Sequence, residues 1–510
     1  MKDVRVRFAP SPTGALHIGG VRTALYNYLL ARKHGGKMLL RIEDTDQNRF
    51  VPGAEEYIKK SLAWVGIEID EGPEQGGPYT PYRQSERKEY YARYAQQLID
   101  SSHAYYAFDS AEDLEAMRER LKAEKGTHLQ YDSTTRMQMN NSLTLSAEDV
   151  RRKLEEGKPY VIRLKVPDSG EIELNDLIRG RVVVGASQID DKVLMKSDGM
   201  PTYHLANVVD DYLMKISHVI RGEEWLPSAP LHVLIYRFLG WESDMPKFAH
   251  LPLLLKPDGN GKLSKRDADQ LGFPIFPLNW TDPKTGELAE GFRERGYLPE
   301  ALVNFLAFLG WNPGTEQELF TMNQLIDAFE IERIGKAGAR FDIQKAKWYN
   351  QQYLRAKSDE ELADYLIEGL KKENINCTPD KAQAVAASLR ERITFPQDLV
   401  ELGRFFFVAP KAFDEKIASK KWNQEAILVA NKLAETFSNH PGSCTAEEAA
   451  TVVQSTTENL GIAQGKIMQA LRLSLTGGAS GPDLMVTMQI LGNEEIVRRL
   501  QYALKTLGDK

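Results

Sequence analysis

The sequence predicts an α/β protein with a parallel sheet in its N-terminal part and an all-helical C-terminal part. Three observations support this prediction. Val4, Val6 and Phe8 alternate with arginines, which is the period-two pattern of a strand. A helical segment and a second apolar run at residues 38–42 follow, at the spacing of a β-α-β unit. From Pro299 onward, apolar residues recur at helical spacing and no segment is typical of a strand.

The turn between the first strand and the first helix predicts a binding site. Residues 10–14 contain two prolines and a glycine, which end the strand, and helical spacing starts at Val21. His17, Gly19 and Gly20 therefore lie at a helix N-terminus, where unpaired N–H groups and a partial positive charge favour phosphate. A common glycine-rich turn with a surface histidine is the alternative, so this stretch needs support from a second site.

The same β-α-β unit predicts where ligands gather. The first helix stops at the two glycines of residues 35–36, and Glu43 lies at the carboxyl end of the next strand. A crossover helix makes the two strands parallel, and ligands bind at the carboxyl ends of parallel strands. Glu43 is therefore either a surface acid or a carboxylate that faces a ligand.

A second segment, residues 252–267, carries cations. Residues 253–255 are typical of a buried strand and residues 258–261 of a mobile turn. Residues 262–266, with the sequence KLSKR, then place three cations and a hydroxyl in five positions. Alone, such a run is most often a solvated basic loop; together with the turn around His17 it takes on another meaning.

These two segments resemble the HIGH and KMSKS signatures of class I aminoacyl-tRNA synthetases. RFAPSPTGALHIGG at residues 7–20, with RIEDTD at residues 41–46, is similar to the glutamyl-tRNA synthetases in particular. YHLANVVDD at residues 203–211 and VIRGEEW at residues 219–225 strengthen the resemblance. The similarity is strongest over residues 1–350, and several motifs in the same order make it specific.

The resemblance implies a Rossmann-type parallel-sheet catalytic domain, an inserted α+β domain for the acceptor end of tRNA, and an all-α anticodon-binding domain of the bacterial type. The expected divisions are 1–100 and 191–256 for the two catalytic halves, 101–190 for the insertion, 257–335 for the KLSKR loop with a helical stem-contact domain, and 336–510 for the anticodon-binding domain.

Further elements follow from periodicity and from capping residues. Helices are expected at 53–65, at 83–101, and after the capping boxes of Ser110 with Asp113 and Ser146 with Asp149, and Ser228 is expected to cap a helix through Leu239. Strands are expected at 160–166, 171–174, 182–184, 193–195 and 216–220. Residues 273–291 suggest a loop insertion without a known function. Arg390 and Arg392 fit either an RNA-facing position or an exposed helix face.

The resemblance also implies the chemistry. Glutamate attacks the α-phosphorus of ATP, which gives glutamyl-adenylate and pyrophosphate, and the terminal adenosine of tRNA then accepts the glutamyl group. His17, Lys262 and Lys265 are the implied catalytic residues, and Gly20 replaces the second histidine of the HIGH pattern. The implied ATP-binding residues are His17, Gly19, Gly20, Glu224, Leu255, Lys262, Ser264, Lys265 and Arg266.

The matched positions for glutamate are Arg7, Ser11, Glu43, Tyr203, Asn207 and Arg221. Glu43 supplies an acceptor for the α-amino group. Arg221 is expected to bind the side-chain carboxylate with help from Arg7 and Tyr203, because an Arg–carboxylate pair is charge-assisted and can be bidentate. Taken singly, a core tyrosine, a capping asparagine and a surface arginine would be the better interpretations, and the shared motif order favours the binding roles instead.

Composition limits the other partners. The formal net charge is −7, from 65 basic and 72 acidic residues, which permits a basic face without indicating one. Two cysteines far apart, Cys377 and Cys444, suit a reducing cytoplasm. No apolar run is long enough for a bilayer, so no membrane partner is expected. The family suggests a monomer, with tRNA(Glu), L-glutamate and ATP as partners and tRNA(Gln) as a possible further one.

We expect no zinc and no dedicated magnesium ligands; magnesium should arrive bound to ATP. Some relatives carry a cysteine-rich zinc site at the start of the inserted region. Here Ala107 and Asp109 occupy two of the cysteine positions, and His103 and His128 alone are too few ligands.

Several alternatives stay open at this point. Glutaminyl-tRNA synthetases are the nearest relatives, but their opening motif is closer to RFPPEPNG…HIGH. A shorter paralogue that glutamylates a tRNA base lacks an anticodon domain, and other adenylyltransferases of the superfamily are smaller. A regulatory tRNA-binding paralogue with an inactive site is disfavoured by His17, Lys262 and Lys265. The sequence does not distinguish an enzyme that charges only tRNA(Glu) from one that also charges tRNA(Gln) with glutamate.

Overall fold

The computed structural model describes residues 3–124, 129–440 and 442–508. The chain divides into two compact units, each described here by itself. The first contains the residues up to Arg295 and Pro299–Ala346, and the second contains Gly296–Leu298 and the residues from Lys347 onward. The junction lies inside one helix, α11 (Ile343–Ala356), whereas the sequence predicts the last domain from residue 336.

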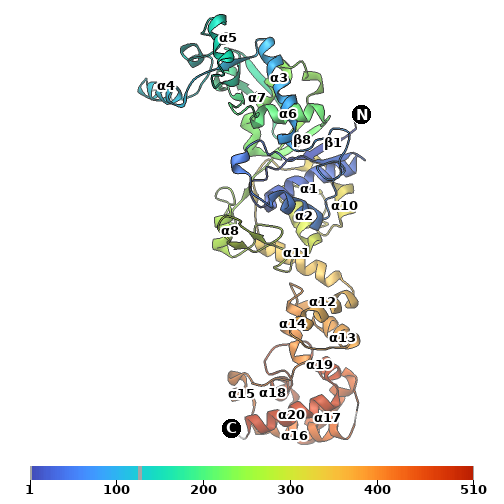
Figure 1. Ribbon diagram of the computed structural model, residues 1–510. Helices are drawn as coiled ribbons and strands as arrows, with labels where there is room; N and C mark the ends of the chain where they lie inside the picture. The colour runs from blue at the N-terminus through green and yellow to red at the C-terminus, as the bar shows by residue number, and fades with distance from the viewer. Residues whose placement is uncertain (1–2, 125–128, 441, 509–510) are drawn as a thin grey trace. The chain divides into compact units, whose positions relative to one another are not determined.

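The predicted N-terminal β-α-β unit is confirmed (Figure 1). β1 (Arg5–Phe8) pairs in parallel with β2 (Lys37–Leu40), and α1 (Ile18–Lys33) connects them. The helix begins before the predicted Val21, because the side chain of His17 caps it. The chain turns after the helix where Gly35 adopts a φ of +63°, a conformation that favours glycine.

A second sheet of the first unit has the strand order β6-β5-β9-β8, and β9 is parallel to both β5 and β8. These strands are Glu171–Asp176 (β5), Gly180–Gly185 (β6), His218–Gly222 (β8) and Lys247–Leu251 (β9). The expected division places β5 and β6 in the insertion at 101–190, and the structure differs here. Because Asp176 of β5 pairs with Phe248 of β9, both strands extend this sheet.

Strands from different sheets also begin close together. The backbone N–H of Ser217 donates to the carbonyl oxygen of Arg5 over 2.9 Å, so that β1 lies beside the start of β8. A further short parallel pair joins β10 (Leu254–Leu255) to β13 (Ala339–Arg340). The expectation of no strand after Pro299 is therefore wrong at β13, because two residues are too few to give an alternating pattern.

An antiparallel sheet with the order β3-β4-β7 and two helices form the rest of the inserted region, although β7 lies just beyond its expected end at residue 190. They are Ala104–Ala107 (β3), Ala111–Ala123 (α4), Ala147–Glu155 (α5), Val161–Leu164 (β4) and Val193–Met195 (β7). The capping box of Ser110 and Asp113 is confirmed. The second box is incomplete: Ser146 caps α5, but the carboxylate of Asp149 accepts from the Ser146 hydroxyl at 2.7 Å.

The remaining helices and the hairpin β11–β12 complete the first unit. They are Ala54–Trp64 (α2), Lys88–Asp100 (α3), Tyr203–Leu213 (α6), Ala229–Phe238 (α7), Lys265–Leu271 (α8), Trp280–Thr281 (β11), Leu288–Ala289 (β12), Pro299–Ala307 (α9) and Met322–Ala328 (α10). The predicted cap by Ser228 is wrong. A 3-10 segment, Glu223–Ser228, leads directly into α7, and the Ser228 side chain makes no capping bond.

The described residues of the second unit form helices and their connections, without a strand, as predicted (Figure 1). Its helices after α11 are Asp359–Lys372 (α12), Pro379–Leu389 (α13), Asp398–Gly403 (α14), Glu415–Lys421 (α15), Gln424–Ser438 (α16), Ala446–Leu460 (α17), Gln464–Thr476 (α18), Leu484–Leu491 (α19) and Asn493–Leu507 (α20). Arg390 has a structural role here: its Nη1 donates to the carbonyl oxygen of Arg355 at 2.6 Å, and its guanidinium pairs with Asp359. A position for Arg392 facing RNA stays a prediction.

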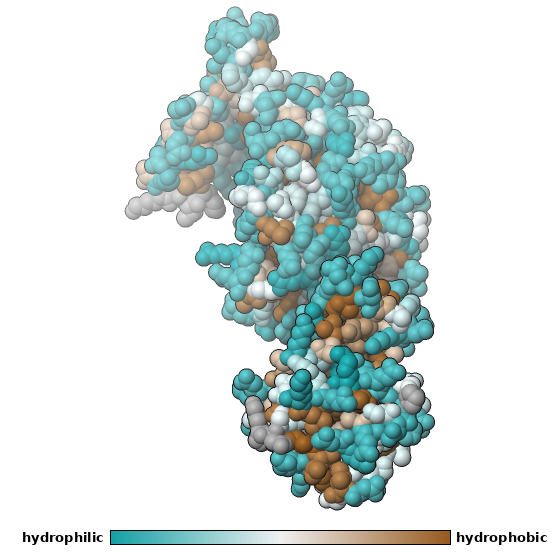
Figure 2. Space-filling view, turned by 60° about the horizontal axis from the view of Figure 1, so that its bottom comes forward, coloured by the Kyte–Doolittle hydropathy of each residue, from teal (hydrophilic) through white to brown (hydrophobic). Residues whose placement is uncertain are grey.

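The surface in view is mostly hydrophilic. Figure 2 shows polar side chains over most of this face, with the larger apolar areas towards the bottom of the view. In the described part of the chain, no helix combines the length and the apolar character needed to cross a bilayer.

Candidate active site

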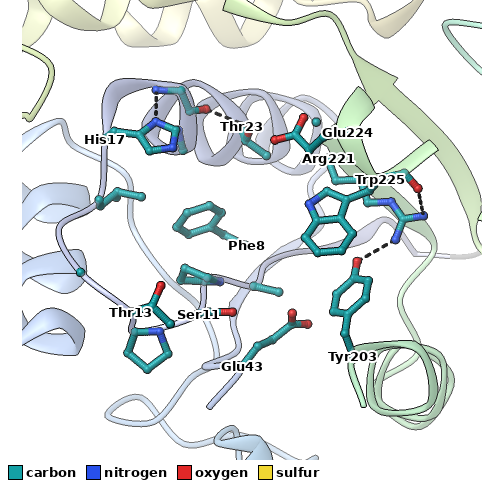
Figure 3. Close-up of a pocket in the computed structure, with 18 of the residues that line it drawn as sticks. Phe8, Ser11, Thr13, His17, Thr23, Glu43, Tyr203, Arg221, Glu224 and Trp225 are labelled. Atoms are coloured by element: carbon teal, nitrogen blue, oxygen red, sulfur yellow. Dashed lines mark hydrogen bonds between the residues drawn. The ribbon is translucent and has the colours of Figure 1, made fainter. Parts of the chain in front are cut away.

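One cavity of about 890 Å³ lies at the carboxyl ends of β1, β2 and β8 in the first unit. It brings together most of the predicted site residues: Arg7, Ser11, His17, Gly19, Gly20, Glu43, Tyr203, Asn207, Arg221, Glu224 and Lys262. Leu255, Ser264, Lys265 and Arg266 do not line it. In Figure 3, His17 and Thr23 lie at one side of the space, Tyr203 and Trp225 at the other, and Glu43 below and between them.

The N-terminus of α1 is arranged differently from the prediction. Nδ1 of His17 accepts hydrogen bonds from the backbone N–H groups of Gly19 at 3.0 Å and Gly20 at 3.4 Å. One of these bonds is drawn as a dashed line from the His17 ring in Figure 3. In this arrangement the two N–H groups are taken up by the imidazole, and a role of Gly19 and Gly20 in binding phosphate stays a prediction. The imidazole takes their place at the cavity wall, since its Nε2 is the ring nitrogen left to meet a ligand.

The two glycines are explained by packing around this cap. A Cβ on Gly19 would lie 2.9 Å from Cε1 of His17, and one on Gly20 would lie 2.4 Å from Cδ1 of Leu16. Both distances are too short for side-chain carbons. The glycines thus permit His17 to fold back over the first turn of the helix.

The charge state of His17 agrees with its role as an acceptor. Although His17 is exposed to solvent at the cavity wall, the protein atoms packed around the ring lower its pKa, and the nearby Lys262 lowers it further. His17 is therefore neutral at neutral pH, with Nδ1 unprotonated. Nζ of Lys262 lies 3.3 Å from Oε1 of Glu224, and its side chain is half exposed.

The KLSKR segment continues from the cavity wall into a helix. Ser264 caps α8 through a capping box with Asp267, and Lys265 is the first residue of that helix. Nζ of Lys265 lies 3.7 Å from the carboxylate of Glu287, on the hairpin within residues 273–291. The insertion without a known function thus provides a partner for Lys265, although both side chains are exposed.

The other side of the cavity rests on a buried ion cluster that the sequence does not reveal. Arg41, which is 0% exposed, donates to Asp211 at 2.7 Å and to Glu43 at 3.0 Å. Arg7 donates to both oxygens of Asp211, at 3.0 and 3.3 Å. Arg41 and Glu43 lie two residues apart, on one side of an extended chain, which is the only local signal for their contact.

Glu43 is held so that one carboxylate oxygen is left for a ligand. Arg41 and Nδ2 of Asn207, the latter at 3.3 Å, both donate to Oε1. Burial raises the pKa of Glu43, while Arg41 and Arg7 oppose this increase. Among the described residues Oε2 has no hydrogen-bond donor, and it is therefore the oxygen suited to an ammonium group.

Arg221 and Tyr203 form the predicted donor pair. Nη1 of Arg221 donates to the hydroxyl oxygen of Tyr203 at 2.8 Å (Figure 3). Nη2 donates to the carbonyl oxygen of Trp225 at 3.4 Å, and the Trp225 ring lies 4.2 Å from the ring of Tyr203. The sequence does not predict two further neighbours: Nε donates to Nε2 of His250 at 3.0 Å, and Nη1 lies 3.4 Å from Nδ1 of His232.

The two positions at which some relatives have zinc-binding cysteines make other contacts in this chain. Ala107 is buried in β3, and Asp109 accepts from the Tyr131 hydroxyl at 2.9 Å and the Asn140 N–H at 2.7 Å. His128 lies outside the described residues. Within residues 3–124, 129–440 and 442–508, no three His, Cys, Asp or Glu side chains are placed to hold a metal ion. The absence of zinc stays a prediction.

The buried histidines predict a pH-dependent stability. Burial, followed by Arg221, lowers the pKa of His232 well below its ordinary value of 6.5. The unfolded chain therefore binds a proton below pH 6.5 that the folded chain does not, so stability falls as the pH decreases. For His232 the expected loss is on the order of 1 kcal/mol per pH unit below 6.5. Hydrogen exchange of α7 between pH 7.5 and 5.5 measures it, and an unchanged slope in His232→Asn would contradict this origin.

Comparisons with known proteins identify the family. The family described as "tRNA synthetases class I (E and Q), catalytic domain" matches residues 3–348, and one described as "Anticodon binding domain" matches residues 359–504. The glutamate–tRNA ligase of Cytophaga hutchinsonii is 64% identical over 100% of this chain and 98% of its own length. The chain belongs to the class I glutamyl-tRNA synthetases. A second relative of this synthetase, the glutamate–tRNA ligase of Amoebophilus asiaticus, is 57% identical over 99% of both chains.

Solved structures agree with this assignment. A crystal structure of a glutamate–tRNA ligase from Elizabethkingia meningosepticum, described as a complex with its amino acid, matches this synthetase with a TM-score of 0.96. It is 49% identical and covers 99% of this chain and 100% of its own. The glutamate–tRNA synthetase of Elizabethkingia anophelis matches with a TM-score of 0.93 and 50% identity over 99% and 100% of the two chains. The predicted class I catalytic fold and helical anticodon-binding domain are confirmed.

Proposed function

We propose that this synthetase attaches L-glutamate to tRNA(Glu) in two ATP-dependent steps. The first forms glutamyl-adenylate and releases pyrophosphate, and the second transfers the glutamyl group to the terminal adenosine of tRNA. The observation that carries the proposal is the cavity that holds Glu43 opposite the Arg221–Tyr203 donor pair. Its support is the full-length similarity to glutamate–tRNA ligases.

Glutamate fits the charges at this side of the cavity. Oε2 of Glu43 accepts from the α-amino group. Tyr203 accepts a hydrogen bond from Arg221, so its own O–H points elsewhere and donates to the ligand. Arg221 offers its remaining Nη2–H, and Ser11 lines the cavity nearby. Arg7 is hydrogen-bonded to Asp211 and adds positive charge near the cavity. Arg221 and Tyr203, rather than Arg7, contact the side-chain carboxylate of glutamate directly.

ATP fits the side that carries His17 and Lys262. Catalysis there depends on positioning and on neutralising phosphate charge, because the protein takes no covalent part. Nε2 of His17 binds the phosphates, and Lys262 leaves its ion pair with Glu224 and binds the phosphates as well. Lys265 lies two residues after Leu263, which lines the cavity. Its ammonium group leaves the exposed carboxylate of Glu287 and binds the leaving pyrophosphate. Magnesium enters with ATP as part of the substrate.

The remaining expectations extend this proposal to the whole chain. Residues 359–504 read the anticodon, and the inserted sheet with α4 and α5 receives the acceptor end of the tRNA. The synthetase acts as a monomer in the cytoplasm. Its discrimination between tRNA(Glu) and tRNA(Gln) depends on contacts in the helical second unit.

Charging assays test the proposal directly. Purified tRNA(Glu) and tRNA(Gln) are incubated separately with labelled glutamate, with and without ATP, and acid-stable label on the RNA is counted. We expect ATP-dependent charging of tRNA(Glu). Glutamate on both tRNAs would support the proposed reaction and show that the enzyme also charges tRNA(Gln). Bound tRNA without charging would overturn the proposal in favour of a regulatory paralogue.

A further inference from the structure

Behind Arg221, a line of three side chains runs across three neighbouring strands. Asp176 ends β5, His250 lies on β9, and Arg221 lies on β8 directly opposite His250 in the parallel register. Nδ1 of His250 lies 2.6 Å from Oδ2 of Asp176, and Nε2 of His250 accepts from Nε of Arg221 at 3.0 Å. The side chains of Asp176 and His250 are 0% exposed, and neither residue lines the cavity.

The hydrogen bonds determine where the proton of His250 lies. The guanidinium of Arg221 has only donors, so Nε2 of His250 must be unprotonated. The ring proton is then on Nδ1 and is donated to Asp176. Oδ1 of the same carboxylate accepts from the N–H groups of Ile178 at 2.9 Å and Arg179 at 2.8 Å, which holds the carboxylate in place.

The charge states agree with this arrangement. Burial lowers the pKa of His250, and Asp176 only partly opposes the decrease. Although burial acts to raise the pKa of Asp176, the hydrogen bonds from His250 and from backbone N–H groups lower it overall. The line therefore consists of a carboxylate, a neutral imidazole and a guanidinium.

We propose that Asp176 and His250 are positioning residues that orient Arg221 and thereby set the preference for a carboxylate over a carboxamide in the amino-acid substrate. This inference rests on the proposed function. With Nε bound to His250, the plane of the guanidinium is held so that Nη1 donates to Tyr203. Tyr203 is then obliged to direct its proton into the cavity. Arg221 and Tyr203, the two groups that meet the end of the substrate side chain, both donate hydrogen bonds. The carboxylate of glutamate can accept both bonds, whereas the NH2 group of glutamine cannot accept a hydrogen bond.

Asp176→Asn tests this arrangement with a minimal change of shape. The asparagine oxygen still accepts from Ile178 and Arg179, but its NH2 group replaces Oδ2 and donates to Nδ1 of His250. The ring proton must then move to Nε2, where it faces the Nε–H of Arg221. Arg221 would then no longer be held for its hydrogen bond to the substrate carboxylate. Because a hydrogen bond to a charged group contributes strongly to binding, we expect KM for glutamate to rise about 10- to 100-fold. KM for ATP should stay within about twofold, and the ratio of kcat/KM for glutamate over glutamine should fall at least about tenfold.

Two variants of His250 keep the test independent of the folding of Asp176→Asn. In His250→Gln the amide oxygen can accept from Arg221 while the NH2 group donates to Asp176, so glutamate preference should return to within about threefold of the wild type. His250→Leu removes the acceptor and should lose the preference. Glu173→Gln, on the same strand but exposed and paired with Arg181, is the matched control and should change neither KM nor the ratio.

The outcomes separate this inference from the proposed function. A wild-type protein that charges no glutamate contradicts the proposed function itself. If the wild type charges glutamate but folded Asp176→Asn and His250→Leu keep the glutamate-to-glutamine ratio within about threefold, the positioning role is overturned. An equal rise of KM for ATP and glutamate at an unchanged ratio would show a purely structural role and would also overturn it.

Discussion

Replacing Lys265 with alanine should lower kcat for charging by roughly 10²–10³ while leaving the fold intact, because one preorganised contact to developing charge is worth about 2.7–4 kcal/mol. Lys265 is 43% exposed in its pairing with Glu287, so little of its effect belongs to folding. Steady-state charging of tRNA(Glu) at saturating glutamate and ATP measures kcat. A decrease of less than about tenfold would reject the role.

Two nearby variants control for the surroundings of Lys265. Lys284→Ala removes another exposed lysine from the same hairpin and should change kcat less than about twofold. Glu287→Gln removes the partner of Lys265. Because exposed ion pairs contribute at most about 1 kcal/mol, we expect only a small effect on kcat and none on stability.

Replacing Arg41 with methionine should destabilise the first unit by about 3–5 kcal/mol, the usual effect of removing one partner from a buried ion pair. Arg41 neutralises Glu43 and Asp211 directly and lies 3.9 Å from Asp210, with every side chain of the group at most 7% exposed. Methionine fills similar space but leaves the carboxylates short of one cation. Hydrogen exchange of the peptides that contain β1 and β2 reports the free energy of opening of this region by itself.

The matched control for Arg41 is Arg181→Met. Arg181 also pairs with a carboxylate through two hydrogen bonds, but its side chain is 64% exposed. We expect a loss below about 1 kcal/mol there. Equal exchange rates in Arg41→Met and in the wild type would show that Arg7 neutralises the cluster without Arg41.

The parts of the fold that the sequence predicts are those encoded locally. Alternation in β1, helical spacing in α1 and the glycines that follow are all properties of neighbouring residues. β13 gives no such signal, because its two residues are placed by pairing with β10. Serine is a common helix-capping residue, but Ser228 ends a 3-10 segment that runs directly into α7, so its side chain caps no free helix end.

The candidate site divides in the same way. The sequence motifs predict Glu43, Tyr203 and Arg221 as binding residues, and all three line the cavity. The groups that orient them come from distant strands: Asp211 is 170 residues from Arg41, and His250 is 74 residues from Asp176. Buried charges of this kind look like ordinary surface residues in the sequence, because their burial is decided only by sheet order.

A direct competition between glutamate and glutamine is the most direct test of the central claim, that the cavity selects a carboxylate. Both amino acids are supplied together with ATP and tRNA(Glu), and the terminal aminoacyl-adenosine is released by nuclease and identified by mass spectrometry. From the value of a hydrogen bond to a charged group we expect glutamate to be favoured at least about ten- to a hundredfold in kcat/KM. Equal incorporation, or a preference for glutamine, would contradict the assignment of Arg221 and Tyr203 as the carboxylate site.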